Sequence, residues 1–232
     1  RLTFVAFLGE YRGGEHAERE RWSGSPGHHS LHESPAAMAM LEKLLGPMGM
    51  MPLQAGGGGA GKPAPGGPNA FVDGGAIGVQ LLRGDVSLMG LGTVTRVEGP
   101  RLSAFGHPMM GGGISDFPTS RAQVHWILAT QNRSIKIGEP LQPMGSLVND
   151  RQASIVVDSK RVPHTFPMRV KISGAPGAPK TEWNMVGAHD PFMAPMIVAV
   201  GIGSALETTA AERNDMTWRA TSRMQLTGHG TL

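Results

Sequence analysis

The sequence contains no cysteine and only one tyrosine, and aromatic residues make up 5% of its 232 positions. Without cysteine the chain cannot form disulfides, thiolate zinc sites or a cysteine nucleophile, and this absence fits a periplasmic or surface protein. Stacking rings are scarce, Lys and Arg are scattered, and the formal net charge is only +3, which argues against a nucleic-acid platform. No apolar run is long enough to span a membrane.

Glycine and proline, in contrast, are abundant, at 34 and 18 residues. This excess argues against a helical bundle and predicts many turns, while a hydrophobic content of 40% is enough for a globular core. The chain opens at Arg1, inside a strand-like stretch, and not at a methionine. We therefore interpret it as a processed or partial chain, in which the lack of a visible signal peptide says nothing about localisation.

The chain divides into three parts. Residues 1–55 combine a short strand, a polar segment and an apolar helix over about 35–45, and we interpret them as an incomplete N-terminal segment that carries the SGSP motif. Residues 56–69, GGGGAGKPAPGGPN, are a predicted flexible linker, because glycine raises backbone entropy and proline blocks helix and sheet. Residues 70–232 form a β-rich domain, and limited proteolysis is expected to cut first in the linker.

Alternating apolar residues predict strands throughout residues 70–232. The expected strands cover residues 77–81, 88–98, 101–105, 122–128, 154–158, 165–172 and 218–226, and Gly99-Pro100 is expected to turn a hairpin. A helix is expected over about 191–213, with Asp190 as its N-cap. The sum is a mainly β fold, an antiparallel sheet or barrel, with one or two packed helices.

The stretch from Gly75 to Pro108 is the most distinctive part of the sequence. It reads GAIGVQLLRGDVSLMGLGTVTRVEGPRLSAFGHP, and it resembles the core of the SpoIVB peptidase family, whose members carry a "VGVxLxRGD" strand, then "GTVT", then a hairpin ending in "AFGHP". A later segment, GSLVNDR at residues 145–151, is similar to the family's "GSxxxDR". The resemblance covers about residues 70–175 and implies a trypsin-like double β-barrel fold and serine-peptidase chemistry.

The resemblance also implies a catalytic pair. His107 matches the family's general base, and histidine titrates near neutral pH, which suits taking up and returning a proton. We expect Gly106 and Pro108 to hold this histidine at the rim of a cleft. Ser23, in Ser23-Gly24-Ser25-Pro26, matches the family's nucleophilic serine, and a hydroxyl needs such a neighbouring base to react.

An acid is expected to orient the histidine of such a pair. Asp116 lies shortly after His107 and is the first candidate, whereas Asp85 and Asp150 are rivals that spacing does not separate. The sequence also departs from the family. Arg21-Trp22 replaces the Gly-Met that precedes the serine, and a polar segment, GHHSLHESP, replaces an apolar hairpin. Both departures favour a degenerate site.

No cofactor or metal site is predicted. Residues 56–62 satisfy G-x-x-x-x-G-K, but Pro63 follows where a phosphate loop needs Ser or Thr and a helix. His28, His29 and His32 lie in a short segment between Gly27 and Pro35, which indicates adventitious metal binding at most.

Two functions remain as hypotheses. The first is a bacterial serine endopeptidase, secreted or at the cell surface, that acts on envelope or surface proteins or on its own precursor. The second is an inactive, peptidase-like scaffold or binding module in a larger cell-envelope assembly, since fold alone does not settle function.

Overall fold

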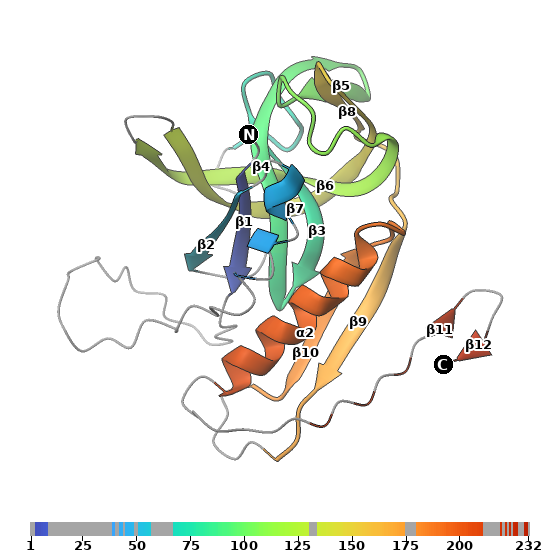
Figure 1. Cartoon of the computed structure of the whole chain (residues 1–232). Helices are drawn as coiled ribbons and strands as arrows, with labels where there is room; N and C mark the ends of the chain where they lie inside the picture. The colour runs from blue at the N-terminus through green and yellow to red at the C-terminus, as the bar shows by residue number, and fades with distance from the viewer. Residues whose placement is uncertain are drawn as a thin grey trace.

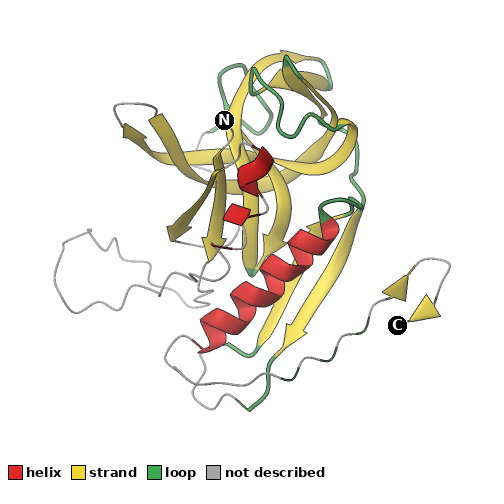
Figure 2. Ribbon diagram, in the orientation of Figure 1, coloured by secondary structure: helices red, strands yellow, loops and turns green. Residues whose placement is uncertain are grey.

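The computed structural model describes residues 3–8, 51–56, 67–129, 134–174 and 180–210, with single residues or short runs at 39, 42–43, 45–48, 219, 221, 223, 225–226 and 230–231. The fold is mainly antiparallel β-sheet with one long helix (Figures 1 and 2). Its elements are β1 Thr3–Leu8, η1 Gly46–Met48, β2 Met51–Gly56, β3 Ala76–Gly84, β4 Val86–Glu98, β5 Arg101–Ala104, β6 Gly113–Ala129, β7 Ser134–Arg151, β8 Ser154–Asp158, β9 Thr165–Lys171, β10 Glu182–Ala188, α2 Ala194–Ala210, β11 Gln225–Leu226 and β12 Gly230–Thr231.

A single sheet of ten strands organises the molecule, in the order β2-β1-β4-β5-β8-β7-β6-β3-β10-β9. The long strand β4 also pairs with β3, so that β3, β4, β5, β8, β7 and β6 form a closed cycle of strand pairings. The main core draws on the strands of this cycle and on α2, with Ile77, Leu147, Ile155 and Ile197 fully buried. The sheet then continues outward from β3 through β10 to β9.

The predicted hairpin is confirmed. β4 and β5 pair from Val94 to Glu98 and from Arg101 to Ala104, with Gly99 at a φ of 59° in the turn between them. The left-handed φ explains the glycine, because a side chain disfavours this conformation. The predicted strands over residues 77–81, 154–158 and 165–172 are confirmed as β3, β8 and β9.

β3 is buried on both faces, which its alternating pattern does not predict. Ile77, Val79 and Leu81 lie in the main core, as the pattern indicates, yet Gly78 and Gln80 on the other face are buried as well. The expected strand over 122–128 is part of the longer β6, and its far end is exposed at Trp126 and Ile127. The reason is that β6 and β7 extend together beyond the cycle as a long hairpin (Figure 1).

α2 begins at Ala194, three residues after Pro191, and packs along β10 and β9 (Figure 1). The helix therefore begins later than the expected 191, and Asp190 caps the turn that leads into it: its Oδ1 accepts hydrogen bonds from the amides of Phe192 and Met193 at 3.0 and 2.8 Å. Within the part of the chain that the structure describes, no helix is both long and apolar enough to cross a membrane.

The first part of the chain, residues 1–55, contributes strands to the same sheet as residues 70–232. β1 pairs with β4 and, in parallel, with β2, so the strands on either side of the apolar helix both join the main sheet. Ala39, Glu42, Lys43 and Leu45 are helical, in agreement with the helix expected over 35–45. Most of the predicted linker, residues 57–66, lies outside the described residues, so its flexibility stays a prediction.

Candidate functional site

Residues 105–113, here called the histidine loop, follow β5 and carry His107. The loop starts with two left-handed residues, Phe105 at a φ of 73° and Gly106 at 72°. Such a φ is uncommon for a phenylalanine and persists only where the surroundings fix it. The Phe105 amide donates to the Thr93 carbonyl at 2.9 Å, and its ring covers Gly92, where a Cβ would overlap the ring. The GTVT and AFGHP motifs therefore lie against each other, joined by this hydrogen bond and this ring contact.

His107 is half-buried and lies outside the core, with its ring centroid 5.7 Å from that of Phe105. Its Nδ1 lies 2.7 Å from the carbonyl oxygen of Pro108. A carbonyl oxygen only accepts hydrogen bonds, so this contact requires the proton on Nδ1, and the lone pair of the neutral ring is then on Nε2. No hydrogen bond to Nε2 occurs among the described residues.

Asp150, at the end of β7, holds the middle of the histidine loop. The residue is 1% exposed, and its carboxylate accepts three backbone hydrogen bonds, from the amides of Met109, Met110 and Gly111 at 2.8, 2.7 and 2.8 Å. Buried charge is costly unless it is hydrogen-bonded, and here three amide donors satisfy it. The GSLVNDR segment therefore binds the residues that directly follow AFGHP, in the loop that carries His107.

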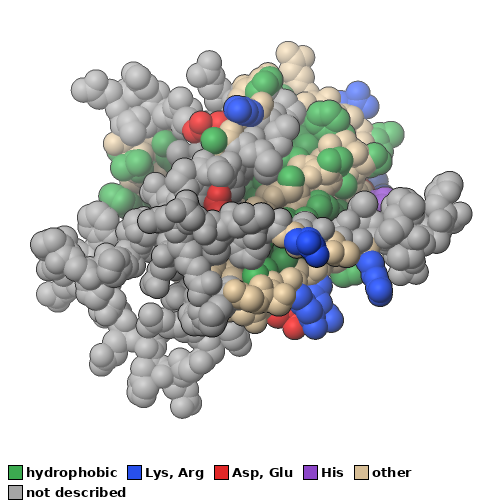
Figure 3. Space-filling model, turned by 60° about the horizontal axis from the view of Figure 1, so that its bottom comes forward, with side chains coloured by type: hydrophobic (Ala, Val, Ile, Leu, Met, Phe, Trp, Pro, Cys, Tyr) green, Lys and Arg blue, Asp and Glu red, His purple; other side chains and the backbone are tan. Residues whose placement is uncertain are grey.

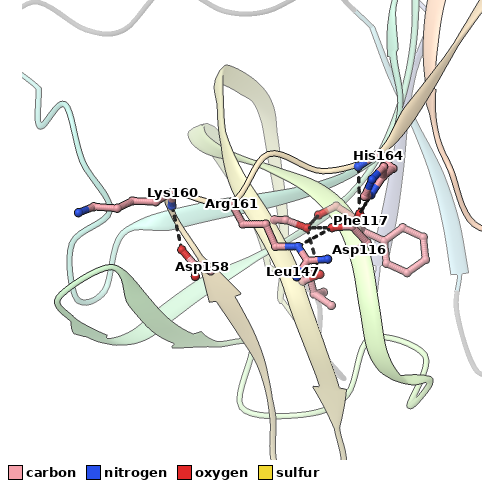
Figure 4. A network of polar contacts seen from close by, with 8 residues as sticks. Asp116, Phe117, Leu147, Asp158, Lys160, Arg161 and His164 are labelled. Carbon is pink, nitrogen blue, oxygen red and sulfur yellow. Dashed lines mark hydrogen bonds and ion pairs between the residues drawn. The ribbon is translucent and has the colours of Figure 1, made fainter.

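Asp116 is the centre of a second polar group, the Asp116 cluster, formed with Ser146, Arg161 and His164. Oδ1 of Asp116 accepts from Ser146 Oγ at 2.8 Å and from Arg161 Nε at 3.0 Å. Oδ2 lies 2.6 Å from His164 Nδ1 and accepts from the His164 amide at 3.0 Å. Figure 4 shows that Arg161 and His164 reach the carboxylate from the segment between β8 and β9, whereas Lys160 points away.

The electrostatics of the Asp116 cluster favour the ionised carboxylate. Burial by itself would raise the pKa of Asp116, but the hydrogen bonds from His164, Ser146 and Arg161 outweigh it and lower the pKa from 3.8 to about 2. Ser146 is fully buried and donates its hydroxyl hydrogen to this carboxylate, not to a histidine. Its oxygen therefore has no imidazole base, and the cluster does not form a nucleophile–base pair.

Asp85, the remaining candidate acid, lies in the turn between β3 and β4. Its carboxylate accepts from the amide of Asn184 at 2.6 Å and pairs with Lys180 at 2.6 Å. Gly84, at a φ of 115°, lets the turn pass close to the Asn184 carbonyl. The RGD segment thus binds the turn to β10.

The structure places the predicted site residues as follows. His107 lies on the histidine loop, whereas Ser23 lies outside the described residues. The hydrogen bonds of Asp116 do not connect it with His107, and within the described ranges neither of its rivals, Asp85 and Asp150, hydrogen-bonds to the His107 ring. Sequence reasoning missed Arg161 and His164, which carried no signal, and treated Ser146 only as part of a motif.

The same reasoning predicted no metal site. Among the described residues, no group of three or more His, Asp or Glu side chains is arranged to hold a metal ion; His28, His29 and His32 lie outside them. On the face in Figure 3, Lys and Arg side chains stand at several separate points. No protein-family model matches this chain, and neither a curated protein nor a solved structure matches it.

Proposed function

We propose that the chain is a serine-type endopeptidase in which His107 is the general base and Ser23 the nucleophile. One observation carries the proposal: Nδ1 of His107 contacts the Pro108 carbonyl at 2.7 Å, which leaves Nε2 as the nitrogen that can accept a proton. The contacts of the GTVT and GSLVNDR segments with the loop that carries this histidine support the resemblance to SpoIVB peptidases.

In this mechanism the neutral Nε2 removes the hydroxyl proton of Ser23 while the serine oxygen bonds to the carbonyl carbon of a peptide. The C=O electron pair moves onto oxygen to give a tetrahedral oxyanion. When the pair returns, the C–N bond breaks, His107 gives its proton to the leaving amine, and an acyl-enzyme remains. His107 then removes a proton from water, and the water oxygen bonds to the acyl carbon. The ester bond to Ser23 breaks, the peptide acid leaves, and His107 returns its proton to the serine oxygen.

The substrate we propose is an envelope or surface protein, or the chain's own precursor, with action outside the bacterial cytoplasm. Asp116 takes a supporting part in this proposal, because it joins β6, which follows the histidine loop, to β7 and to the segment after β8. We also propose the trypsin-like double barrel, with the closed cycle of strand pairings as one of its barrels.

The alternative is an inactive scaffold or binding module in a cell-envelope assembly. One observation favours it: the carboxylates of Asp85, Asp116 and Asp150 bond other groups, so none of them accepts directly from His107. Arg21 and Trp22, in place of a Gly-Met pair, support the same alternative. Loss of one oxyanion donor typically costs on the order of 100–1000-fold in rate.

Labelling with a fluorophosphonate probe separates the two functions. In the active enzyme the Ser23 oxygen displaces fluoride from phosphorus and forms a stable O–P bond, and Ser23→Ala abolishes the product. His107→Ala is expected to slow labelling by orders of magnitude without unfolding the domain, because the two residues act as a unit. Labelling that persists in Ser23→Ala would assign a different nucleophile. A folded wild-type chain that stays unlabelled would favour the scaffold.

A further inference from the structure

We infer that Asp150 is a positioning residue for His107, acting through the peptide group between Pro108 and Met109. This inference rests on the proposed function. It assigns to Asp150 the role that an aspartate bonded directly to the histidine has in other serine peptidases. The observation behind it is that two hydrogen bonds share one peptide group. Its N–H, from Met109, donates to Asp150, and its C=O, from Pro108, accepts from His107.

The geometry of the peptide bond makes this arrangement linear. The described residues contain no cis peptide bond, so the Pro108 carbonyl and the Met109 amide point in opposite directions. Asp150 Oδ1 holds the N–H end at 2.8 Å, and His107 Nδ1 lies 2.7 Å from the oxygen at the other end. The order is therefore carboxylate, peptide group, imidazole, with the carboxylate and the ring at opposite edges of the peptide group.

This order has an electrostatic consequence. A carboxylate that accepts a hydrogen bond from a peptide N–H draws the amide hydrogen toward its negative charge. The carbonyl oxygen of the same peptide group then becomes more negative. Hydrogen bonds in such chains strengthen one another. The Pro108 oxygen then becomes a better acceptor for Nδ1–H, which favours the tautomer with a free lone pair on Nε2 and stabilises the ring after it takes up a proton. These are the effects that a triad aspartate has on its histidine.

The hydrogen-bond partners of Asp150 differ from those of the other candidate acids. Oδ2 accepts from Met110 and Gly111, so the carboxylate is fixed by three amides and is almost completely buried. Asp116, in contrast, uses both oxygens for Ser146, Arg161 and His164. Only Asp150, among the candidate acids, contacts the peptide group that touches His107.

The test is the tautomer of His107, read from the ring ¹⁵N shifts of the labelled full chain at a pH where the ring is neutral. In the wild type we expect Nδ1 to carry the proton and Nε2 to be bare. In Asp150→Asn, whose NH₂ group faces amide donors, we expect the Nδ1–H population to fall and fluorophosphonate labelling of Ser23 to slow by about tenfold to a hundredfold. The matched control is Asp158→Asn, which alters a carboxylate that accepts one loop amide, that of Lys160, away from His107.

The outcomes decide between the inference and the proposed function. A wild-type His107 protonated on Nε2 would overturn the inference without any variant, as would a folded Asp150→Asn with unchanged tautomer and labelling rate. If the tautomer depends on Asp150 while wild-type Ser23 stays unlabelled, the positioning role stands and the peptidase proposal fails. If labelling occurs and depends on His107 but not on Asp150, the peptidase proposal stands and the inference fails.

Discussion

The histidine loop and the Asp116 cluster each combine a histidine with a shielded carboxylate, but they connect the two groups in different ways. In the cluster, His164 contacts Asp116 directly, and Ser146 donates to the same carboxylate. In the loop, His107 reaches Asp150 only through a peptide group, and its Nε2 has no hydrogen-bond partner in the described ranges. The cluster thus joins its imidazole directly to its carboxylate, whereas in the loop a peptide group lies between the two.

The difference shows that proximity of Ser, His and Asp is not enough for nucleophilic catalysis. Ser146, Asp116 and His164 have the right composition, but the carboxylate lies between the hydroxyl and the imidazole. A serine needs the imidazole next to its oxygen and the carboxylate beyond it. The cluster joins β6, β7 and the segment before β9, which is a structural task, and the loop carries the chemistry that we propose.

The largest expected effect comes from removing the loop carboxylate. Asp150→Ala leaves three amide donors without their acceptor, those of the buried Met109, the half-buried Met110 and the exposed Gly111. An unsatisfied buried donor costs about 1–3 kcal/mol and a donor that water can reach costs less, so we expect a loss of roughly 2–4 kcal/mol in the free energy of unfolding. Urea denaturation measures it. A loss below about 1 kcal/mol would mean that water replaces the carboxylate and that the loop does not depend on Asp150.

Much of the fold could be predicted from the sequence, because its signals are local. The Gly99-Pro100 turn, the alternation in β9 and the Asp190 cap each depend on a few adjacent residues. Burial of both faces of β3 could not be predicted, since it depends on strands distant in the chain. The exposure of the far end of β6 could not be predicted either. Its apolar residues indicate burial, but β6 and β7 extend there beyond the other strands of the cycle.

The site was predictable in part. The Phe105-Gly106-His107-Pro108 motif identified the loop, but not the Pro108 carbonyl as the partner of the ring, because backbone groups leave no trace in a sequence. Asp116 was chosen for its nearness to His107 along the chain, yet its partners Ser146, Arg161 and His164 come from 30, 45 and 48 residues away. Such contacts follow from strand register, which spacing does not reveal.

The next largest effect concerns the contact that orients the loop. Gly92→Ala would place a methyl group inside the Phe105 ring, so the ring and the left-handed Phe105 backbone must move. We expect a loss of about 1–3 kcal/mol in stability, as for overpacked cores, together with slower labelling of Ser23. The matched control is Gly112→Ala, which lies in the histidine loop itself. A Cβ added at Gly112 would meet only Ser115 Oγ, at 3.9 Å. Equal effects of the two substitutions would contradict a role for the Gly92 contact.

A smaller, pH-dependent effect is expected in the Asp116 cluster. Because the pKa of Asp116 is lowered from 3.8 to about 2 in the folded chain, its stabilising contribution is complete above pH 3.8 and disappears as the pH falls toward 2. Asp116→Asn should cost about 1–2 kcal/mol at neutral pH and should flatten the dependence of unfolding free energy on pH between about 2 and 4. An unchanged slope in this variant would show that other carboxylates cause the acid sensitivity.

The smallest expected effect sharpens the comparison of the two histidines. The His164 side chain is 77% exposed, and exposed ion pairs contribute little, so His164→Ala should lower stability by no more than about 1 kcal/mol. The variant also keeps the amide of residue 164, which donates to Asp116 at 3.0 Å and preserves the cluster. Fluorophosphonate labelling should proceed at the wild-type rate, whereas His107→Ala should nearly abolish it, because His107 is the general base of the proposed mechanism. Parallel labelling time courses of the two variants, both checked for folding by circular dichroism, provide the measurement. If His164→Ala slows labelling as much as His107→Ala does, the base belongs to the Asp116 cluster, and the assignment of chemistry to the histidine loop is wrong.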